Sequence, residues 1–318
     1  MLQNNKKKLI ILTGPTAAGK TELSIALAKA VGGEIISADS VQVYKELDIG
    51  SAKITCEEMQ GVHHHLIDVL LPTEDFSVAL FKDMAVKAMD EIYSREHIPI
   101  IVGGTGFYIQ SVLYDINFEE TDDDGYRSML EEKYKQEGAH ALHDMLREVD
   151  PVSADNIHMN NVKRVIRAIE FYHQTGKCIS EHNELERQKT SPYNAAYFVL
   201  NCDRDILYDR IEKRIDIMLE NGLIDEVKNL VSKYSLTKDM VSMQGLGYKE
   251  ILAYLNGEYS LDEAIYILKR DTRHFAKRQL TWFRRERDVI WVDKDTLKDE
   301  KEQLDYILSV LKSKDIFT

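Results

Sequence analysis

One segment near the start of the chain, GPTAAGKT, constrains the fold more than any other. It fits the pattern G-x-x-x-x-G-K-[ST], and it stands directly after the apolar run Leu9 to Thr13 and directly before the helical pattern ELSIALAKAV. Glycines in such a turn let backbone N–H groups point inward, and the following helix N-terminus adds its dipole. The segment therefore predicts a strand, an anion-binding loop and a helix in that order.

The predicted phosphate-binding residues are Gly14, Pro15, Thr16, Ala17, Ala18, Gly19, Lys20 and Thr21. Lys20 would place a point charge on a phosphate, and the Thr21 hydroxyl could face a Mg²⁺ ion. The alternative is a chance glycine-rich turn, which the flanking strand and helix patterns disfavour. The loop specifies phosphate and leaves the reaction open, because kinases, NTPases and other transferases all use it.

Short apolar runs recur along the chain and alternate with helix-period segments. After the first, they are Glu34 to Ala38, Leu66 to Leu70, Ile98 to Val102, Tyr197 to Leu200 and Val289 to Val292. This alternation is typical of a parallel sheet with crossover helices. We expect an α/β protein with a P-loop parallel-sheet core and a helical C-terminal region.

The spacing of these runs breaks after the fourth. Residues 103–195 contain no convincing strand pattern, but helix-period patterns occur at Tyr126 to Gln136, Ala139 to Val149 and Val162 to Tyr172, the last followed by Gly176 as a C-cap. A structureless loop of that length is rare inside a compact domain. We therefore predict an inserted all-helical subdomain at 117–192, between core segments 1–116 and 193–318.

Composition limits the compartment and the partners. The three cysteines, Cys56, Cys178 and Cys202, are widely spaced, which favours free thiols in the cytoplasm over a disulfide framework. The apolar run that follows the N-terminal lysines is too short for a signal peptide or a membrane span. A net charge of −13 would repel a polyanion, so any nucleic-acid contact needs local basic patches. We expect a monomer.

Polar residues follow the second apolar run, at the edge of the sheet where ligands bind in open α/β folds. Asp39 could accept a proton from an attacking group or hold Mg²⁺ through water, and the alternative is an ordinary capping turn. Gln42 offers both a donor and an acceptor, which suits an adenine edge. Ser40 and Val41 lie between them.

A second glycine cluster, Gly103-Gly104-Thr105-Gly106, follows the fourth run. Thr105 could donate to a phosphate or leaving oxygen, although a plain tight turn is the alternative. After the fifth run, Arg210 and Arg214 stand four residues apart, so one helix face would present two guanidinium groups to a diphosphate. Surface ion pairs with neighbouring acids are the alternative.

Two further segments are locally basic. The stretch from Lys269 to Asp288 carries eight Lys or Arg against three acids, and Arg278 is among its candidates for contact with phosphates of a nucleic-acid backbone. Lys163, Arg164 and Arg167 form a smaller basic face on a predicted helix of the insertion.

Three consecutive histidines, His63 to His65, suggest a metal site. We favour packing or substrate contact near Asp68 instead, because consecutive residues point in different directions and no further ligand stands at a telling spacing.

Taken in order, GPTAAGKT, DSVQVYKELDIGSAK, HHLID, GGTGFYIQ, RIEKRIDIMLENGLIDEV, QGLGYKE and AKRQLTWFR resemble the bacterial tRNA dimethylallyltransferase (tRNA isopentenyltransferase) family over nearly the whole chain. The departures are slight: Ala18 stands where the family often has Ser, and Val41 and Phe107 replace other apolar residues.

The resemblance implies transfer of a dimethylallyl group from dimethylallyl diphosphate to N6 of adenosine 37, beside the tRNA anticodon. By the family pattern Asp39 is the general base and Thr105 contacts the reacting oxygen of the donor. Lys20, Thr21, Arg210 and Arg214 with Mg²⁺ neutralise the leaving pyrophosphate.

The acceptor base must be flipped out of the anticodon loop to reach such a site. We expect Gln42, Lys163, Arg164 and Arg167 to contact the anticodon stem-loop, with Arg278 as a further candidate. The principal alternative is a P-loop kinase that uses ATP on a small molecule or nucleoside, with Asp39 as its base. A prenyltransferase acting on free adenine nucleotides is a second alternative, and a non-catalytic RNA-binding protein is a distant third.

Overall fold

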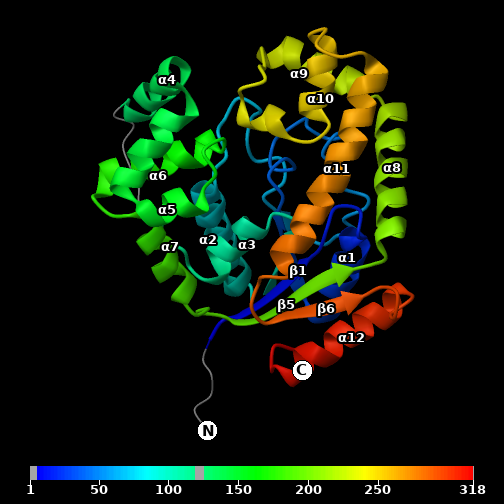
Figure 1. The fold of residues 1–318 in the computed structure, drawn as a ribbon. Coiled ribbons are helices and arrows are strands. Elements are labelled where there is room, and N and C mark those ends of the chain that lie inside the picture. The colour runs from blue at the N-terminus through cyan, green and yellow to red at the C-terminus, as the bar shows by residue number, and fades with distance from the viewer. Residues whose placement is uncertain (1–5, 119–124, 318) are drawn as a thin grey trace. The chain divides into compact units, whose positions relative to one another are not determined.

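The structure is a computed structural model, and it describes residues 6–118 and 125–317. Six strands form one parallel sheet in the order β3-β2-β4-β1-β5-β6 (Figure 1). The strands are β1 (Lys8–Thr13), β2 (Gly33–Ala38), β3 (His64–His65), β4 (Ile98–Gly103), β5 (Asn194–Asn201) and β6 (Val289–Asp293). The predicted α/β class with a parallel-sheet core is confirmed.

Both faces of the sheet are buried, as a parallel sheet requires. On one face, Ile10 and Leu12 of β1 join a core cluster with residues of α1 (Lys20–Val31) and α12 (Glu300–Ser313). The alternate residues Leu9 and Ile11 are fully buried too and point to the other face. Helix α2 (Val78–Ser94) packs on β2 and β4 outside that cluster, and α3 (Gly106–Leu113) packs on α2.

The rest of the main unit is largely helical, as expected for the C-terminal region. It contains α8 (Arg204–Glu220), α9 (Leu223–Tyr234), the short 3₁₀ helix η1 (Val241–Gln244), α10 (Tyr248–Leu255) and α11 (Leu261–Phe283). Helices α8 and α11 run side by side in Figure 1 and pack on each other. Among the described residues, no helix is both long and apolar enough to cross a membrane.

The chain divides into two compact units, residues 1–113 with 191–318 and residues 114–190. The second unit contains α4 (Tyr126–Val149), α5 (Pro151–Asn156), α6 (Val162–Thr175) and α7 (Ile179–Gln188), whose apolar faces share a core of their own. Gly138 has φ 82° inside α4 and separates the two helical segments that the sequence predicts there. Gly176 caps α6 in the left-handed conformation, as predicted.

One predicted strand is wrong. The run Leu66 to Leu70 was expected to be the third strand, but β3 covers only His64 and His65, and Leu70 makes an isolated bridge with Tyr44. Leu66 and Asp68 have positive φ angles of 63° and 55°, so the backbone leaves the extended region immediately after His65. Hydrophobicity alone did not reveal this turn.

Candidate active site

Three strand ends meet at the carboxyl edge of the sheet, where β4 lies between β1 and β2. Asp39 follows β2, the Gly104–Thr105 turn follows β4, and the phosphate loop follows β1. The Thr13 hydroxyl donates to the Gly103 carbonyl at 2.7 Å, and the Thr105 N–H donates to the Ala38 carbonyl at 3.4 Å. The fold therefore brings the predicted base, the predicted hydroxyl donor and the predicted anion loop together.

The phosphate loop adopts the strand-turn-helix arrangement that the sequence predicts. Gly14 must be glycine, because a Cβ there would lie 2.9 Å from the Leu200 carbonyl oxygen. Gly19 ends the loop in the left-handed conformation, with φ 79°. The Lys20 ammonium donates to the carbonyls of Gly14 and Pro15 at 3.0 and 2.8 Å. Thr21 is exposed in the first turn of α1.

Charges of opposite sign gather beside this loop. Burial and then the nearby Arg214 guanidinium lower the pKa of Lys20 to about 8, against the opposing influence of Asp39. Burial likewise lowers the pKa of Arg214, again against the influence of Asp39. In the described part of the chain no salt bridge joins any of these three side chains to another residue. The site thus holds two partly buried cations that an anionic ligand would stabilise.

The two arginines of α8 have different charged neighbours. Arg214 belongs with Lys20 and Asp39, whereas Arg210 lies near Lys294, whose pKa is lowered by burial and then by Arg210. Lys294 also donates to the Ala18 carbonyl at 3.2 Å. A small cavity there is lined by Gly19, Glu22, Leu23, Arg210, Lys294, Lys298, Glu300 and Gln303. Sequence analysis did not identify Lys294.

Asp39 has a structural role as well as an accessible oxygen. Its Oδ1 accepts from the N–H groups of Val41 and Gln42 at 2.9 and 3.2 Å, which is the capping turn offered as the alternative interpretation. This turn fixes the carboxylate, and within the described residues Oδ2 has no hydrogen-bond partner. Burial and then the Asp39 charge raise the pKa of Tyr108 to about 12, so a neutral phenol stands nearby.

Gln279 is a site residue that sequence analysis quoted only within a motif. It lies on α11, is buried, accepts from the Thr16 N–H at 2.9 Å and donates to the Gly104 carbonyl at 3.0 Å. Its amide thereby ties the phosphate loop to the β4 turn. A Cβ on Gly104 would lie 2.2 Å from Nε2 of this amide, which explains that glycine. Only the fold could reveal the pairing, because the partners are far apart in sequence.

The basic residues predicted to contact nucleic acid differ in exposure and in whether a carboxylate of the protein already pairs with them. Arg278 is exposed on α11 and lies over the Phe275 ring at 5.7 Å, while Arg273 on the same helix pairs with Glu212. In the second unit Lys163 and Arg164 are exposed on α6. Arg167 instead pairs with Glu170 at 3.2 Å, so its charge is partly used within the unit.

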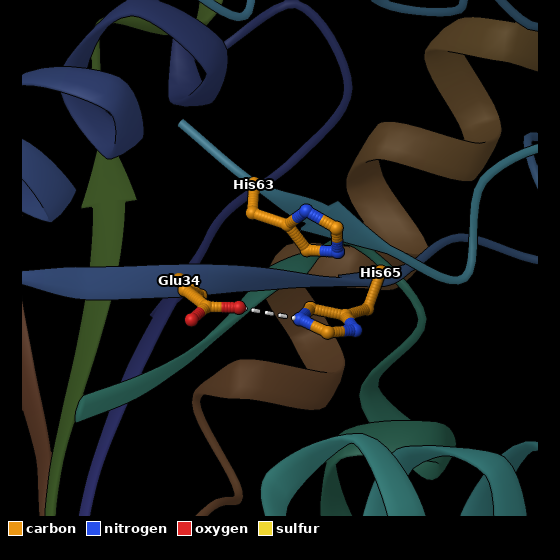
Figure 2. Close-up of side chains that lie close together, drawn as sticks. All are labelled: Glu34, His63 and His65. Carbon is orange, nitrogen blue, oxygen red and sulfur yellow. Dashed lines mark hydrogen bonds and ion pairs between the residues drawn. The ribbon is translucent and has the colours of Figure 1, made fainter. Parts of the chain in front are cut away.

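The histidine cluster lies at the amino edge of the sheet and includes a residue that the sequence did not point to (Figure 2). His63 and His65 lie together, with ring centroids 4.3 Å apart, and Glu34 of neighbouring β2 completes a group whose ligand atoms lie within 4.8 Å of one another. Glu34 does not stand at a telling spacing from the histidines in the sequence, so only the fold brings it to them.

A metal ion nevertheless fits this group poorly. The Arg95 guanidinium donates to both Glu34 oxygens at 2.8 Å, His65 Nε2 lies 2.8 Å from Oε2, and His97 Nδ1 lies 2.7 Å from Oε1. A metal would have to displace a cation that already neutralises the carboxylate. We interpret the cluster as a structural hydrogen-bond network.

Two protein-family models match the sequence of this chain. A model described as IPP transferase matches residues 42–286, and one described as isopentenyl transferase matches residues 7–71. Together they cover the phosphate loop, Asp39, the β4 turn and α11.

Full-length relatives point the same way. The chain is 59% identical to the tRNA dimethylallyltransferase of Lachnoclostridium phytofermentans, covering 97% of this chain and 98% of the relative. It is 52% identical to that of Acetivibrio thermocellus, covering 95% and 97%. A crystal structure of tRNA isopentenylpyrophosphate transferase from Bacillus halodurans matches with 46% identity and a TM-score of 0.73, covering 98% of both chains.

A second solved structure, of a eukaryotic dimethylallyltransferase acting on tRNA, matches with 30% identity and a TM-score of 0.83. It covers 98% of this chain and 79% of that chain.

Proposed function

Because the chain belongs to the tRNA dimethylallyltransferase family, we propose that it transfers the dimethylallyl group of dimethylallyl diphosphate to N6 of adenosine 37 in the tRNA anticodon loop, releasing pyrophosphate. The chain is an enzyme of the prenyl-transferring class, and tRNA is its substrate. The observation that carries the finer proposal is the joint placement of Lys20, Arg214 and Asp39 at the carboxyl edge of the sheet.

The donor diphosphate is held in the loop formed by residues 14–21. Backbone N–H groups of the loop and the N-terminus of α1 face the anion. Lys20 leaves its two carbonyl partners for the phosphates, and Arg214 adds a second charge, while Arg210 and Lys294 approach from the cavity that they line with Gly19. Because negative charge develops on the leaving pyrophosphate, these cations stabilise the transition state more than the ground state.

Mg²⁺ fits this site. The exposed Thr21 hydroxyl, in the first turn of the helix after the loop, is the usual side-chain ligand in such loops. Asp39, whose charge acts on the neighbouring Lys20, would hold the ion through water. A Mg²⁺ ion usually keeps several waters and binds few protein groups, so a single hydroxyl is sufficient with the phosphates. When bound, the ion neutralises phosphate charge.

The acceptor amine is activated by position and by Asp39. The Oδ1 hydrogen bonds hold the carboxylate in one orientation, and the remaining oxygen accepts the proton that the amine loses as the N–C bond forms. Thr105, at the end of β4, contacts the bridging oxygen of the donor. The exocyclic amine of adenine is a weak nucleophile, so the enzyme acts mainly by placing the amine and the allylic carbon in line.

The anticodon stem-loop is the acceptor that these residues recognise. Asp39, Ser40, Val41 and Gln42 surround the flipped adenine, and Lys163, Arg164, Arg167 and Arg278 contact the phosphate backbone. Of these cations, Arg167 contributes least, because its ion pair with Glu170 competes with the phosphate contact.

Incubation with labelled dimethylallyl diphosphate, Mg²⁺ and unmodified tRNA tests the proposal. We expect label in the tRNA, located by mass spectrometry on N6 of adenosine 37, and an anticodon stem-loop should serve as acceptor in place of the whole tRNA. Faster turnover of AMP than of the stem-loop would favour an enzyme acting on free nucleotides. Consumption of ATP with no label on the RNA would favour a kinase.

A further inference from the structure

One carboxylate far from the sheet edge organises the segment that follows Gln42. Glu226, in the first turn of α9, accepts three consecutive backbone N–H groups: those of Asp48 and Ile49 at Oε2, 3.1 and 2.6 Å away, and that of Gly50 at Oε1, 3.1 Å away. The buried Tyr248 hydroxyl donates to Oε1 at 2.8 Å. One side chain thus satisfies four donors from two separate parts of the chain.

The geometry around Gly50 shows how tightly this arrangement is packed. A Cβ on Gly50 would lie 2.6 Å from Cζ of the Tyr248 ring, so the turn requires glycine there. Burial, followed by the Glu226 charge, raises the pKa of Tyr248, so the phenol remains a donor. The turn of residues 48–50 is therefore hydrogen-bonded to a carboxylate and packed against an aromatic ring.

Hydrogen bonds connect the turn of residues 48–50 to the Gln42 side chain. Further bonds continue the turn, since the N–H groups of Ala52 and Lys53 donate to the carbonyls of Ile49 and Asp48 at 2.9 Å. The carbonyls of Ser51 and Ala52 accept from Gln42 Nε2 at 3.3 and 3.4 Å. With Nε2 turned toward the backbone, Oε1 is the Gln42 atom left to accept from a ligand.

We propose that Glu226 is a positioning residue for tRNA recognition, acting through Gln42. Its carboxylate fixes the 48–50 turn, the turn fixes the Ser51 and Ala52 carbonyls, and these orient the Gln42 amide so that Oε1 meets an N–H donor of the flipped adenine. This inference rests on the proposed function, because it assumes that Gln42 contacts the base. It assigns to α9 a role in acceptor binding and none in donor binding.

A matched control is a second carboxylate contact between the same loop and the same helix, made by Glu46 of the loop. Glu46 accepts from Lys233 Nζ at 2.6 Å and from the Tyr234 hydroxyl at 2.8 Å, but its side chain is 45% exposed. Glu46→Gln removes a carboxylate contact between this loop and α9 without touching the turn beside Gln42. It should leave transfer kinetics unchanged.

A double-mutant cycle of Glu226→Gln and Gln42→Ala tests the inference. Glu226→Gln should lower kcat/KM for the anticodon stem-loop about tenfold, because the amide turns N–H groups toward the backbone donors, and should leave the KM for dimethylallyl diphosphate unchanged. In the Gln42→Ala background the same substitution should have little further effect, since both act on one contact. Tyr248→Phe, which removes one donor, should act in the same direction but more weakly.

Full additivity of the two substitutions would overturn the inference, as would an equal rise in the KM for dimethylallyl diphosphate. If Glu226→Gln does not fold, the cycle with Tyr248→Phe decides by the same criterion. No effect of Gln42→Ala would remove the assumed contact and with it the inference, while donor transfer to tRNA stands. Failure of the unsubstituted enzyme to label tRNA would instead contradict the proposed function.

Discussion

The two ends of one parallel sheet both carry a cluster of charged side chains, yet the clusters are built in opposite ways. At the amino edge, the buried Glu34 carboxylate is contacted by Arg95, His65 and His97, so its charge is compensated within the protein. At the carboxyl edge, Lys20 and Arg214 are partly buried and have no ion-pair partner among the described residues.

The difference teaches how a binding site can be distinguished from a structural network. Buried charges are costly unless they are paired, so a complete network such as that of Glu34 stabilises the fold and has little left for a ligand. A cluster whose cations have no ion-pair partner is instead stabilised when an oppositely charged ligand binds. Substitutions at the carboxyl edge should therefore affect catalysis, and those at the amino edge should affect stability.

The largest expected effect is that of Asp39→Asn, which keeps the shape of the side chain but removes the base. Single-turnover transfer to tRNA should slow by about 10³-fold, as for loss of a general base. Binding of dimethylallyl diphosphate, followed by calorimetry, should change little. Glu34→Gln is the control from the opposite edge, and its rate per folded molecule should equal that of the unsubstituted enzyme.

Lys20→Met should reduce kcat by about 10²-fold, because it removes a charge that stabilises the leaving pyrophosphate. The lowered pKa of Lys20, about 8, also predicts a proton effect. A bound diphosphate favours the charged ammonium, so donor binding near pH 8.5 should take up a proton. Calorimetry in buffers of different ionisation enthalpy measures this uptake, which should disappear in Lys20→Met. Its persistence there would show that another group titrates.

Glu34→Gln should lower the free energy of unfolding by about 3 kcal/mol, the usual consequence of breaking a buried ionic network. Urea denaturation at pH 7 measures the change. An unchanged denaturation midpoint, or a loss of activity in the folded enzyme, would contradict the division of roles between the two edges.

The pH dependence of stability gives a separate test of the same carboxylate. Hydrogen bonds from Arg95, then from the histidines, hold the pKa of Glu34 well below its usual value near 4.5. A depressed pKa in the folded state contributes stability that is complete above the unfolded pKa and is lost as pH falls toward the folded one. The unsubstituted enzyme should therefore lose stability below about pH 5 more steeply than Glu34→Gln.

The smallest expected effects are those of the exposed cations. Arg278→Ala and Lys163→Ala should each weaken tRNA binding a few-fold and reduce the slope of log Kd against log salt by somewhat less than one, about 0.7 to 0.9 for each phosphate that is no longer neutralised. Filter binding at several salt concentrations measures this slope. Arg167→Ala should change it less, because Glu170 already uses part of that charge.

The sequence predicted more of the sheet than of the site. Five of the six strands lie where apolar runs predicted them, because a strand buried on both faces needs such a run. The third strand was misplaced, since positive φ angles at Leu66 and Asp68 leave no trace in hydrophobicity. The phosphate loop was recognisable because its chemistry depends on local glycine spacing.

Contacts between distant segments could not be predicted in this way. Gln279 joins the phosphate loop to the β4 turn, Glu226 holds residues 48–50, and Arg95 neutralises Glu34. The local sequence around each of these side chains does not indicate which distant residue it contacts. The different neighbours of Arg210 and Arg214 also needed the fold, because helical spacing gives a shared face but not the charged residues that lie beside each arginine.

A structure of the enzyme with an unreactive thiodiphosphate analogue of the donor and an anticodon stem-loop tests the central claim most directly. The account predicts the diphosphate in the loop of residues 14–21, contacted by Lys20 and Arg214. The adenine amine should lie within hydrogen-bonding distance of Asp39, roughly 2.6 to 3.2 Å. Donor and base bound in separate cavities, or a diphosphate bound away from Lys20, would contradict it.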